Sequence, residues 1–174
     1  MEGCIFCSIV EGKTPSFKVF ENPQFLVTLD INPATKGHLI VIPKMHYKHV
    51  IEMPEPEYQG LCSVARALMV MLVDYGAKGV NLLYSIGEAA GQRSSHLIMH
   101  VIPRYDNDKV HLVWEPQKLT ESDFRAIQSA IAAKINTQGV PQQIKQEPQQ
   151  MPQPVPEQPK QEPTIRIERR TGAY

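Results

Sequence analysis

Two pairs of residues in this sequence have the types and the spacing that chemical sites use. Cys4 and Cys7 form a Cys-x-x-Cys pair in "MEGCIFCSIV", and His96 and His100 stand four residues apart in "SSHLIMHVIPR". In an extended strand the side chains at 96, 98 and 100 share one face, so a polar group would be natural at 98. The sequence has Ile98 there. The run therefore indicates a polar site interrupted by one apolar side chain.

The cysteine pair indicates a metal site if two more ligands are available. Structural zinc takes four nitrogen or sulfur ligands in a tetrahedron. The candidates are the six histidines, between which spacing alone does not choose: His38, His46, His49, His96, His100 and His111. Three cysteines are too few and too odd in number for a disulfide framework. A thioredoxin-like redox role is the weaker alternative, because "CIFC" does not follow a strand of a βαβ unit.

Composition limits the classes of ligand and compartment. The chain has 174 residues, a hydrophobic fraction of 42% and equal numbers of basic and acidic residues. Because the basic residues are spread out, we expect no general binding of nucleic acid or of anionic membranes. We see no apolar run of the ~18 residues that a membrane helix needs, and no charged segment followed by an apolar leader at the amino terminus. We expect a cytoplasmic protein that binds its ligand at a local site.

The elements that must position these residues are strands in hairpins and two helices. Strand-like runs joined by turns too short for crossover helices occur at 17–20, 25–31, 38–43, 79–86 and 96–103. A first helix follows Pro54 and has apolar residues at helical spacing, namely Leu61, Val64, Leu68, Leu72 and Tyr75. Cys62 lies on this helix, and we expect it to be buried.

A second helix opens at Thr120, where "TESD" resembles a capping box. It places Phe124, Ile127, Ile131 and Ile135 on one stripe. Strands in hairpins together with a few helices predict an α+β domain over residues 1–137.

The composition changes sharply at Gln138. Residues 138–163 are dominated by proline and glutamine without apolar periodicity, which predicts a disordered or polyproline-like extension over 138–174. Within it, "TIRIERR" at 164–170 alternates apolar and polar residues, so it could add as a docking strand to a sheet edge. A protein partner bound through 164–174 is one expectation, and a solvated tail is the other.

Four segments together resemble the histidine triad (HIT) superfamily: "CIFCSIVEGKTPS", "LDINPATKGHLIVIPKMHY", "GEAAGQ" and "HLIMHVIPR". They occur in the order and at the spacings of that family. The resemblance implies a five-stranded antiparallel sheet with helices, a homodimer, and binding of a nucleotide or nucleotide conjugate. Active members hydrolyse or transfer nucleoside monophosphates through the middle histidine of His-φ-His-φ-His-φ-φ, where φ is apolar. His96 and His100 match the first and third histidines, and Ile98 stands at the nucleophile's position.

The resemblance also implies the site residues. The zinc-bearing branch of the family would use Cys4, Cys7, His46 and His96 as ligands, which leaves His38 as a hydrogen-bonded structural residue. The implied nucleotide-binding residues are Ile5, Phe6, Ile9, Leu29, Asp30, Ile31, Ser85, Gln92, Arg93 and His100. The sequence departs from the family's pattern at two of these places. Ser85 replaces an asparagine that is frequent in the family, and "RSS" at 93–95 replaces the residues that usually precede the first histidine.

Three functions follow as hypotheses, and the sequence leaves open whether the chain is an enzyme. In the first, it is a zinc-bearing HIT protein that binds a nucleotide but is catalytically impaired because Ile98 replaces the nucleophile. In the second, it is an active nucleotide hydrolase or nucleotidyl transferase with altered geometry, using His100 or another group. In the third, it is a scaffold that acts through its dimer and its tail. We favour the first, because the metal positions are intact while the nucleophile is missing.

Overall fold

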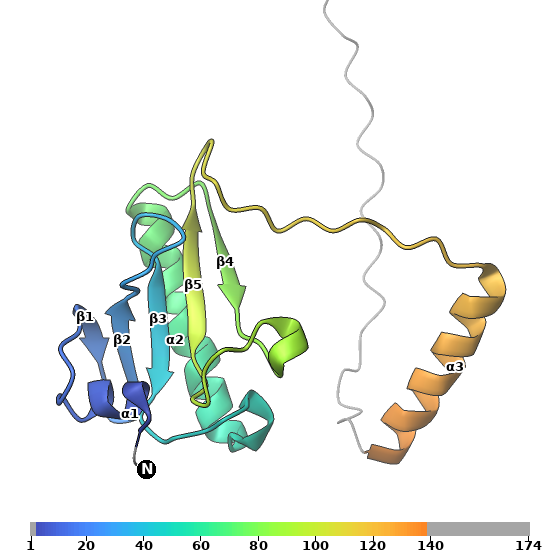
Figure 1. Cartoon of the computed structure of the whole chain (residues 1–174), viewed down its shortest axis with the longest axis horizontal. Helices are drawn as coiled ribbons and strands as arrows, with labels where there is room; N and C mark the ends of the chain where they lie inside the picture. Colours follow the sequence, from blue (N-terminus) through green and yellow to red (C-terminus); the bar gives the residue numbers. More distant parts are fainter. Residues whose placement is uncertain (1–2, 139–174) are drawn as a thin grey trace, which may run out of the picture. The chain divides into compact units, whose positions relative to one another are not determined.

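A computed structural model describes residues 3–138 (Figure 1), with side chains described to residue 135. The chain divides into two compact units, residues 1–114 and 115–174, which we describe separately. The extension was predicted at 138–174, and all of it after residue 138, including the docking strand at 164–170, lies outside the described residues. The predicted domain limit at residue 137 stays a prediction.

The first unit contains one sheet of five antiparallel strands in the order β1-β2-β3-β5-β4. The strands are β1 (Lys18–Glu21), β2 (Phe25–Leu29), β3 (Leu39–Pro43), β4 (Gly79–Leu83) and β5 (Met99–Arg104). Two antiparallel pairings form the centre of the sheet: β2 pairs with β3, with Leu29 opposite Leu39, and β3 pairs with β5, with Ile40 opposite His100. The predicted α+β class with a five-stranded antiparallel sheet is confirmed.

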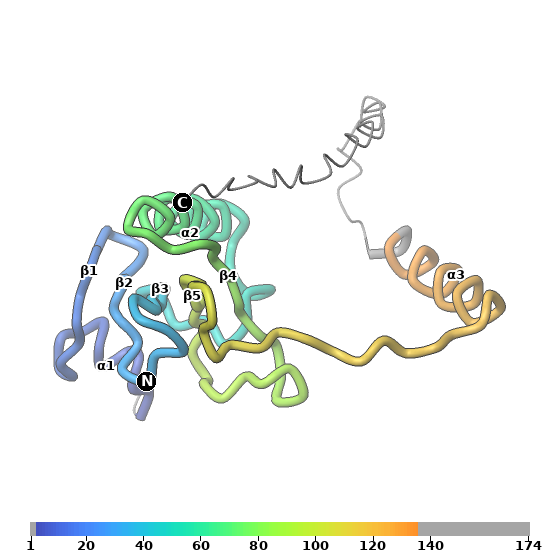
Figure 2. Tube along the Cα trace, turned by 90° about the horizontal axis from the view of Figure 1, so that it is seen from above, coloured from blue at the N-terminus to red at the C-terminus, as the bar shows by residue number. Residues whose placement is uncertain are grey.

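Two helices lie on opposite faces of this sheet (Figure 2). The long helix α2 (Glu55–Asp74) covers one face, and the short helix α1 (Ile5–Val10) lies over the other. Two 3₁₀ turns, η1 (Val50–Glu52) and η2 (Glu88–Ala90), lie in the loops before α2 and β5. The alternation of strand residues separates two apolar clusters, one on each face.

The larger cluster packs under α2. It contains buried residues of β2, β3 and β5 together with the buried stripe of α2, which is Leu61, Ala65, Leu68 and Leu72. The smaller cluster lies on the α1 face and contains the buried side chains of Leu26, Ile40 and Ile42, against which Phe6, Ile9, Val10 and Ile98 pack.

Three details differ from the sequence predictions. Strand β5 begins at Met99, so His96 and Ile98 precede the hydrogen-bonded ladder. Leu97 and Met99 nevertheless pack on the α2 face and Ile98 on the α1 face, so the alternation extends beyond the ladder. Tyr75 was expected on the apolar stripe of α2. The helix ends at Asp74, so Tyr75 is its C-cap, and its side chain is exposed. Cys62 is also exposed, so the expectation that it is buried is wrong.

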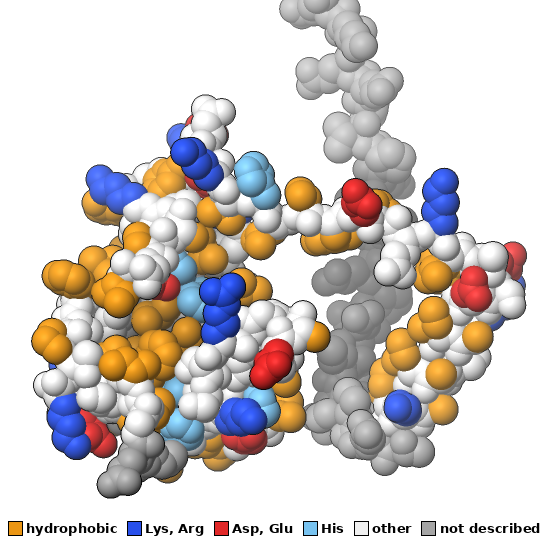
Figure 3. Space-filling view, viewed as in Figure 1, with side chains coloured by type: hydrophobic (Ala, Val, Ile, Leu, Met, Phe, Trp, Pro, Cys, Tyr) orange, Lys and Arg blue, Asp and Glu red, His pale blue; other side chains and the backbone are white. Residues whose placement is uncertain are grey.

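The second unit contains α3 (Glu121–Gln138). The predicted capping box is present: the N–H of Asp123 donates to Oγ1 of Thr120 (3.2 Å), and the N–H of Thr120 donates to Oδ2 of Asp123 (2.9 Å). The four residues of the predicted stripe are all exposed, and Figure 3 shows hydrophobic side chains along one side of the helix. None of the described helices combines the length and the apolar character that crossing a bilayer requires.

Candidate metal centre and ligand cavity

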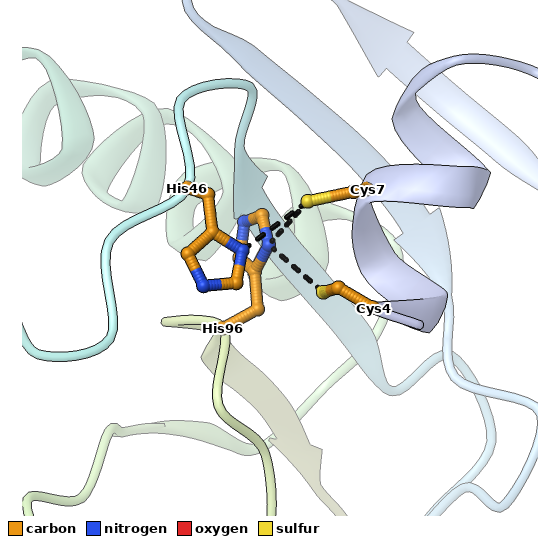
Figure 4. A group of neighbouring side chains, drawn as sticks. All are labelled: Cys4, Cys7, His46 and His96. Atoms are coloured by element: carbon orange, nitrogen blue, oxygen red, sulfur yellow. Dashed lines mark hydrogen bonds between the residues drawn. The ribbon is translucent and has the colours of Figure 1, made fainter. Parts of the chain in front are cut away.

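Four potential metal ligands converge beside the first turn of α1 (Figure 4). Cys4 is the N-cap of α1 and Cys7 lies on its first turn, and a three-residue spacing puts both thiols on one side of a helix. His46 lies in the loop after β3, and His96 lies just before β5. The ligand atoms of the four residues all lie within 4.8 Å of one another.

The distances between these atoms fit a tetrahedral zinc site. With Zn–S near 2.3 Å and Zn–N near 2.0–2.1 Å, neighbouring ligand atoms should be about 3.3–3.8 Å apart. Nδ1 of His96 lies 3.5 Å from the sulfurs of both Cys4 and Cys7, within this range, and Nδ1 of His46 lies 3.2 Å from the sulfur of Cys7, just below it. Two thiols and two imidazoles at these separations form a Cys₂His₂ set, which zinc favours.

The second ring nitrogen of His96 has its own partner. Nε2 of His96 lies 2.9 Å from the carbonyl oxygen of Pro43, so Nε2 carries the proton and donates it. This fixes the tautomer in which Nδ1 has its lone pair free for a metal, as is usual for ligating histidines. Burial also lowers the pKa of His96, which favours the neutral form that binds metals.

The remaining candidate histidines have other surroundings. Nδ1 of His49 lies 3.1 Å from Oε1 of Glu52, and His111 is exposed. The structure thus brings together the four residues that the family resemblance selected, whereas spacing had left all six histidines open.

His38 and His100 form a hydrogen-bonded pair next to Asp30. The N–H of Ala34 donates to Nδ1 of His38 (3.1 Å), so this nitrogen carries no proton. The proton of neutral His38 is therefore on Nε2, which donates to Nδ1 of His100 at 3.0 Å. It follows that neutral His100 carries its proton on Nε2, the nitrogen on the side of the ring away from His38.

Burial keeps this pair neutral. It lowers the pKa of both His38 and His100, although the charge of Asp30 acts in the opposite direction. Oδ2 of Asp30 lies 3.7 Å from Nδ1 of each histidine, which is too long for a hydrogen bond. The ligand atoms of Asp30, His38 and His100 lie close enough together to hold a metal. The hydrogen bonds of the two histidines instead indicate a structural role, as the resemblance implied for His38.

A cavity of about 630 Å³ opens on the α1 face of the sheet. Its apolar wall includes Ile5, Phe6 and Ile98, and its polar wall is the loop that leads to β5. Figure 3 shows histidine side chains among hydrophobic ones on this side of the first unit. Arg93 also lines the cavity, and no carboxylate does so among the described residues, so the electrostatics favour an anionic ligand.

The cavity contains part of the predicted nucleotide site. Its lining includes the predicted Ile5, Phe6, Ser85, Gln92, Arg93 and His100, and it adds Ser94 and Ser95, which the sequence did not single out as binding residues. The other four predicted residues, Ile9, Leu29, Asp30 and Ile31, lie outside the lining. Nothing in the sequence around the two serines indicated a binding role, because only the path of the loop brings them to the cavity.

Comparison with known proteins agrees with this fold and this site. The sequence model of the HIT domain family matches residues 11–107 of this chain. Protein hit of Bacillus subtilis is 38% identical over 141 residues, which cover 77% of this chain and 95% of that protein. The chain belongs to the HIT family.

Two further HIT relatives bear on the site. The crystal structure of a Zn-bound histidine triad family protein from Mycobacterium smegmatis has a TM-score of 0.60 and 32% identity, covering 78% of this chain and 97% of that one. The adenosine 5'-monophosphoramidase hnt1 of Schizosaccharomyces pombe is 29% identical over 133 residues, which cover 76% of this chain and 98% of the relative.

Proposed function

We propose that this HIT protein binds zinc and a nucleotide but has lost the family's nucleotidyl chemistry. The observation that carries the proposal is Ile98, which stands between His96 and His100 where the family's nucleophilic histidine belongs. Isoleucine offers neither a lone pair nor a proton. Its side chain instead packs against the small apolar cluster of Leu26, Ile40 and Ile42.

Neither remaining histidine is suited to replace the nucleophile. Nδ1 of His96 faces the two thiols and its Nε2 donates to Pro43, so both of its nitrogens are engaged. Nδ1 of His100 accepts from His38, so its other nitrogen carries a proton and has no lone pair for attack. A neutral imidazole in this tautomer is neither a nucleophile nor a general base at Nε2. This argues against the alternative of an active enzyme that uses His100.

Binding of a nucleotide is supported by the cavity and by the relatives. The cavity combines an apolar wall suited to a base with Arg93 and a run of serines suited to a phosphate group. Since one relative is named an adenosine 5'-monophosphoramidase, AMP and adenosine 5'-phosphoramidate are the probes to use first.

The test has two parts on one zinc-loaded sample. Calorimetry should show that AMP binds, and ligand that binds only the folded state should raise the melting temperature. Incubation with adenosine 5'-phosphoramidate should give a rate lower by about 10⁶-fold than that of a HIT enzyme with a complete triad, the usual effect of losing a covalent nucleophile. Turnover near that of such an enzyme would refute the proposal.

We also propose that the chain is a homodimer that pairs through β4. This strand is at one end of the sheet, contains no charged residue, and exposes Leu82 and Leu83. An uncharged edge strand is a template for pairing with another chain. Light scattering of the purified chain should give twice the monomer mass, and Leu82→Lys should give the monomer. A monomeric parent chain would contradict this proposal without affecting the first.

A further inference from the structure

The side chain of Gln92 lines the cavity but makes its hydrogen bonds to the backbone. Its Oε1 accepts from the N–H of Gly87 at 2.7 Å. Its Nε2 donates to the carbonyl oxygens of Lys48 (2.8 Å) and Ser94 (3.0 Å). An amide nitrogen has two protons, so both donors of Gln92 are used within the protein.

The two carbonyl groups that accept from Gln92 belong to the two segments that carry metal ligands. Lys48 is two residues after His46, and Ser94 is two residues before His96. A backbone hydrogen bond joins the same segments, since the N–H of Leu97 donates to the carbonyl oxygen of Tyr47 at 2.6 Å. The side chain of Gln92 is therefore hydrogen-bonded to both segments, and through Gly87 it also joins them to the loop that contains η2.

The cavity and the metal centre share a wall. Cys4 and His96 are metal ligands and also line the cavity, next to Ile5 and Phe6 of α1. A metal that holds Cys4 and Cys7 against His46 and His96 would fix the start of α1 relative to the loop that contains Arg93. Without it, hydrogen bonds alone join the segment that ends at Lys48 to the segment before His96.

We propose that Gln92 is a positioning residue that couples metal binding to nucleotide binding. The proposal rests on the proposed function, because it requires that the cavity binds a nucleotide. Zinc orders the segment from His46 to Lys48, and Gln92 passes that order to the loop at 87–95, which supplies the polar wall. Coupling between two binding sites is reciprocal, so the nucleotide must strengthen zinc binding by the same factor by which zinc strengthens nucleotide binding.

The experiment measures zinc affinity of the full chain by competition with a chromogenic chelator, with and without saturating AMP. In the parent chain we expect AMP to raise the zinc affinity by about 10-fold, within the usual range of coupling between sites. In Gln92→Ala the zinc affinity without AMP should change by less than about 2-fold, while the effect of AMP should fall to about 3-fold or less, the part that the shared wall carries. An undiminished effect of AMP in Gln92→Ala would overturn the role of Gln92. Gln92→Glu should behave like Gln92→Ala, because a carboxylate cannot donate to the carbonyl of Lys48.

Gln59→Ala is the matched control. Gln59 is an exposed glutamine of α2 whose amide donates to Glu55 and which does not line the cavity, so its loss should leave the effect of AMP intact. AMP binding with no change in zinc affinity of the parent chain would overturn the coupling and leave the proposed function standing. A Gln92→Ala chain that binds AMP more weakly by the same factor with and without zinc would show a ligand contact instead. No AMP binding by the zinc-loaded parent would refute both.

Discussion

Replacing Ile98 by histidine tests whether Ile98 stands where the family's nucleophilic histidine belongs. Ile98 is half-buried against the cluster of Leu26, Ile40 and Ile42 on β2 and β3. Complete burial of such a side chain is worth about 1.5–3 kcal/mol, so a half-buried isoleucine should contribute roughly 1–1.5 kcal/mol. The partly buried imidazole adds a small desolvation cost. We expect Ile98→His to lower the free energy of unfolding by about 1–2 kcal/mol, or the melting temperature by about 4–10 °C.

The same substitution should create activity. If the rest of the site is assembled, the introduced imidazole can attack the phosphorus of adenosine 5'-phosphoramidate, displace ammonia and form a nucleotidyl-histidine that water then hydrolyses. Even partial recovery of the ~10⁶-fold attributed to a covalent nucleophile should raise the rate by at least about 10²-fold. The assay is AMP release by chromatography, with mass spectrometry of the acid-quenched protein to locate the adduct.

A matched variant separates the chemistry from the change in stability. Ile9 packs on the same apolar cluster but lies outside the lining of the cavity, so Ile9→His should destabilise the protein similarly and give no activity. The reasoning is refuted if the parent chain turns over the phosphoramidate as fast as Ile98→His does. It is equally refuted if Ile98→His folds and binds AMP but remains as inactive as Ile9→His.

Three other predictions concern stability. Cys7→Ser should release most of the zinc, measured by elemental analysis, and lower the melting temperature by more than about 10 °C, because a metal that binds only the folded state stabilises it; unchanged metal content would exclude Cys7 as a ligand. Since burial holds the pKa of His38 and His100 below the unfolded value, the unfolded chain takes up more protons as pH falls below about 6.5, and stability should decrease there. Urea titrations between pH 7 and pH 5 should show a smaller decrease for His38→Gln than for the parent, and equal slopes would contradict the assignment. Gly37 has φ +84°, so Gly37→Ala should cost about 1–2 kcal/mol by urea denaturation, whereas no loss would show that the turn relaxes.

The fold was largely predictable because its signals are local. Strand-like apolar runs bounded by turn residues located all five strands, and the spacing of Leu61, Leu68 and Leu72 located α2. Spacing could not locate the ends of elements. Tyr75 continues the stripe in sequence, but it is exposed where α2 ends.

The metal centre was predictable only by resemblance. Cys4 and His96 are 92 positions apart, and only the path of the chain brings their ligand atoms to 3.5 Å. The hydrogen bonds of Gln92 could not be predicted, because the resemblance placed this residue among those that contact the nucleotide, and the direction of its amide depends on where the carbonyl of Lys48 lies. A side chain that hydrogen-bonds to backbone atoms far away in the sequence cannot be recognised from its neighbours in the sequence.

The hydrogen bond from Ala34 to His38 has a consequence for the design of chemical probes. By fixing the proton on Nε2 of His38, it leaves His100 with only a donor on its remaining ring nitrogen. A compound that brings a phosphoryl, sulfonyl or carbonyl oxygen to this nitrogen gains a hydrogen bond, whereas an amine or amidine sets two donors against each other. A fragment library for this cavity should therefore be chosen for acceptors, and the ¹⁵N shifts of His100 in the free protein would report its tautomer before any compound is made.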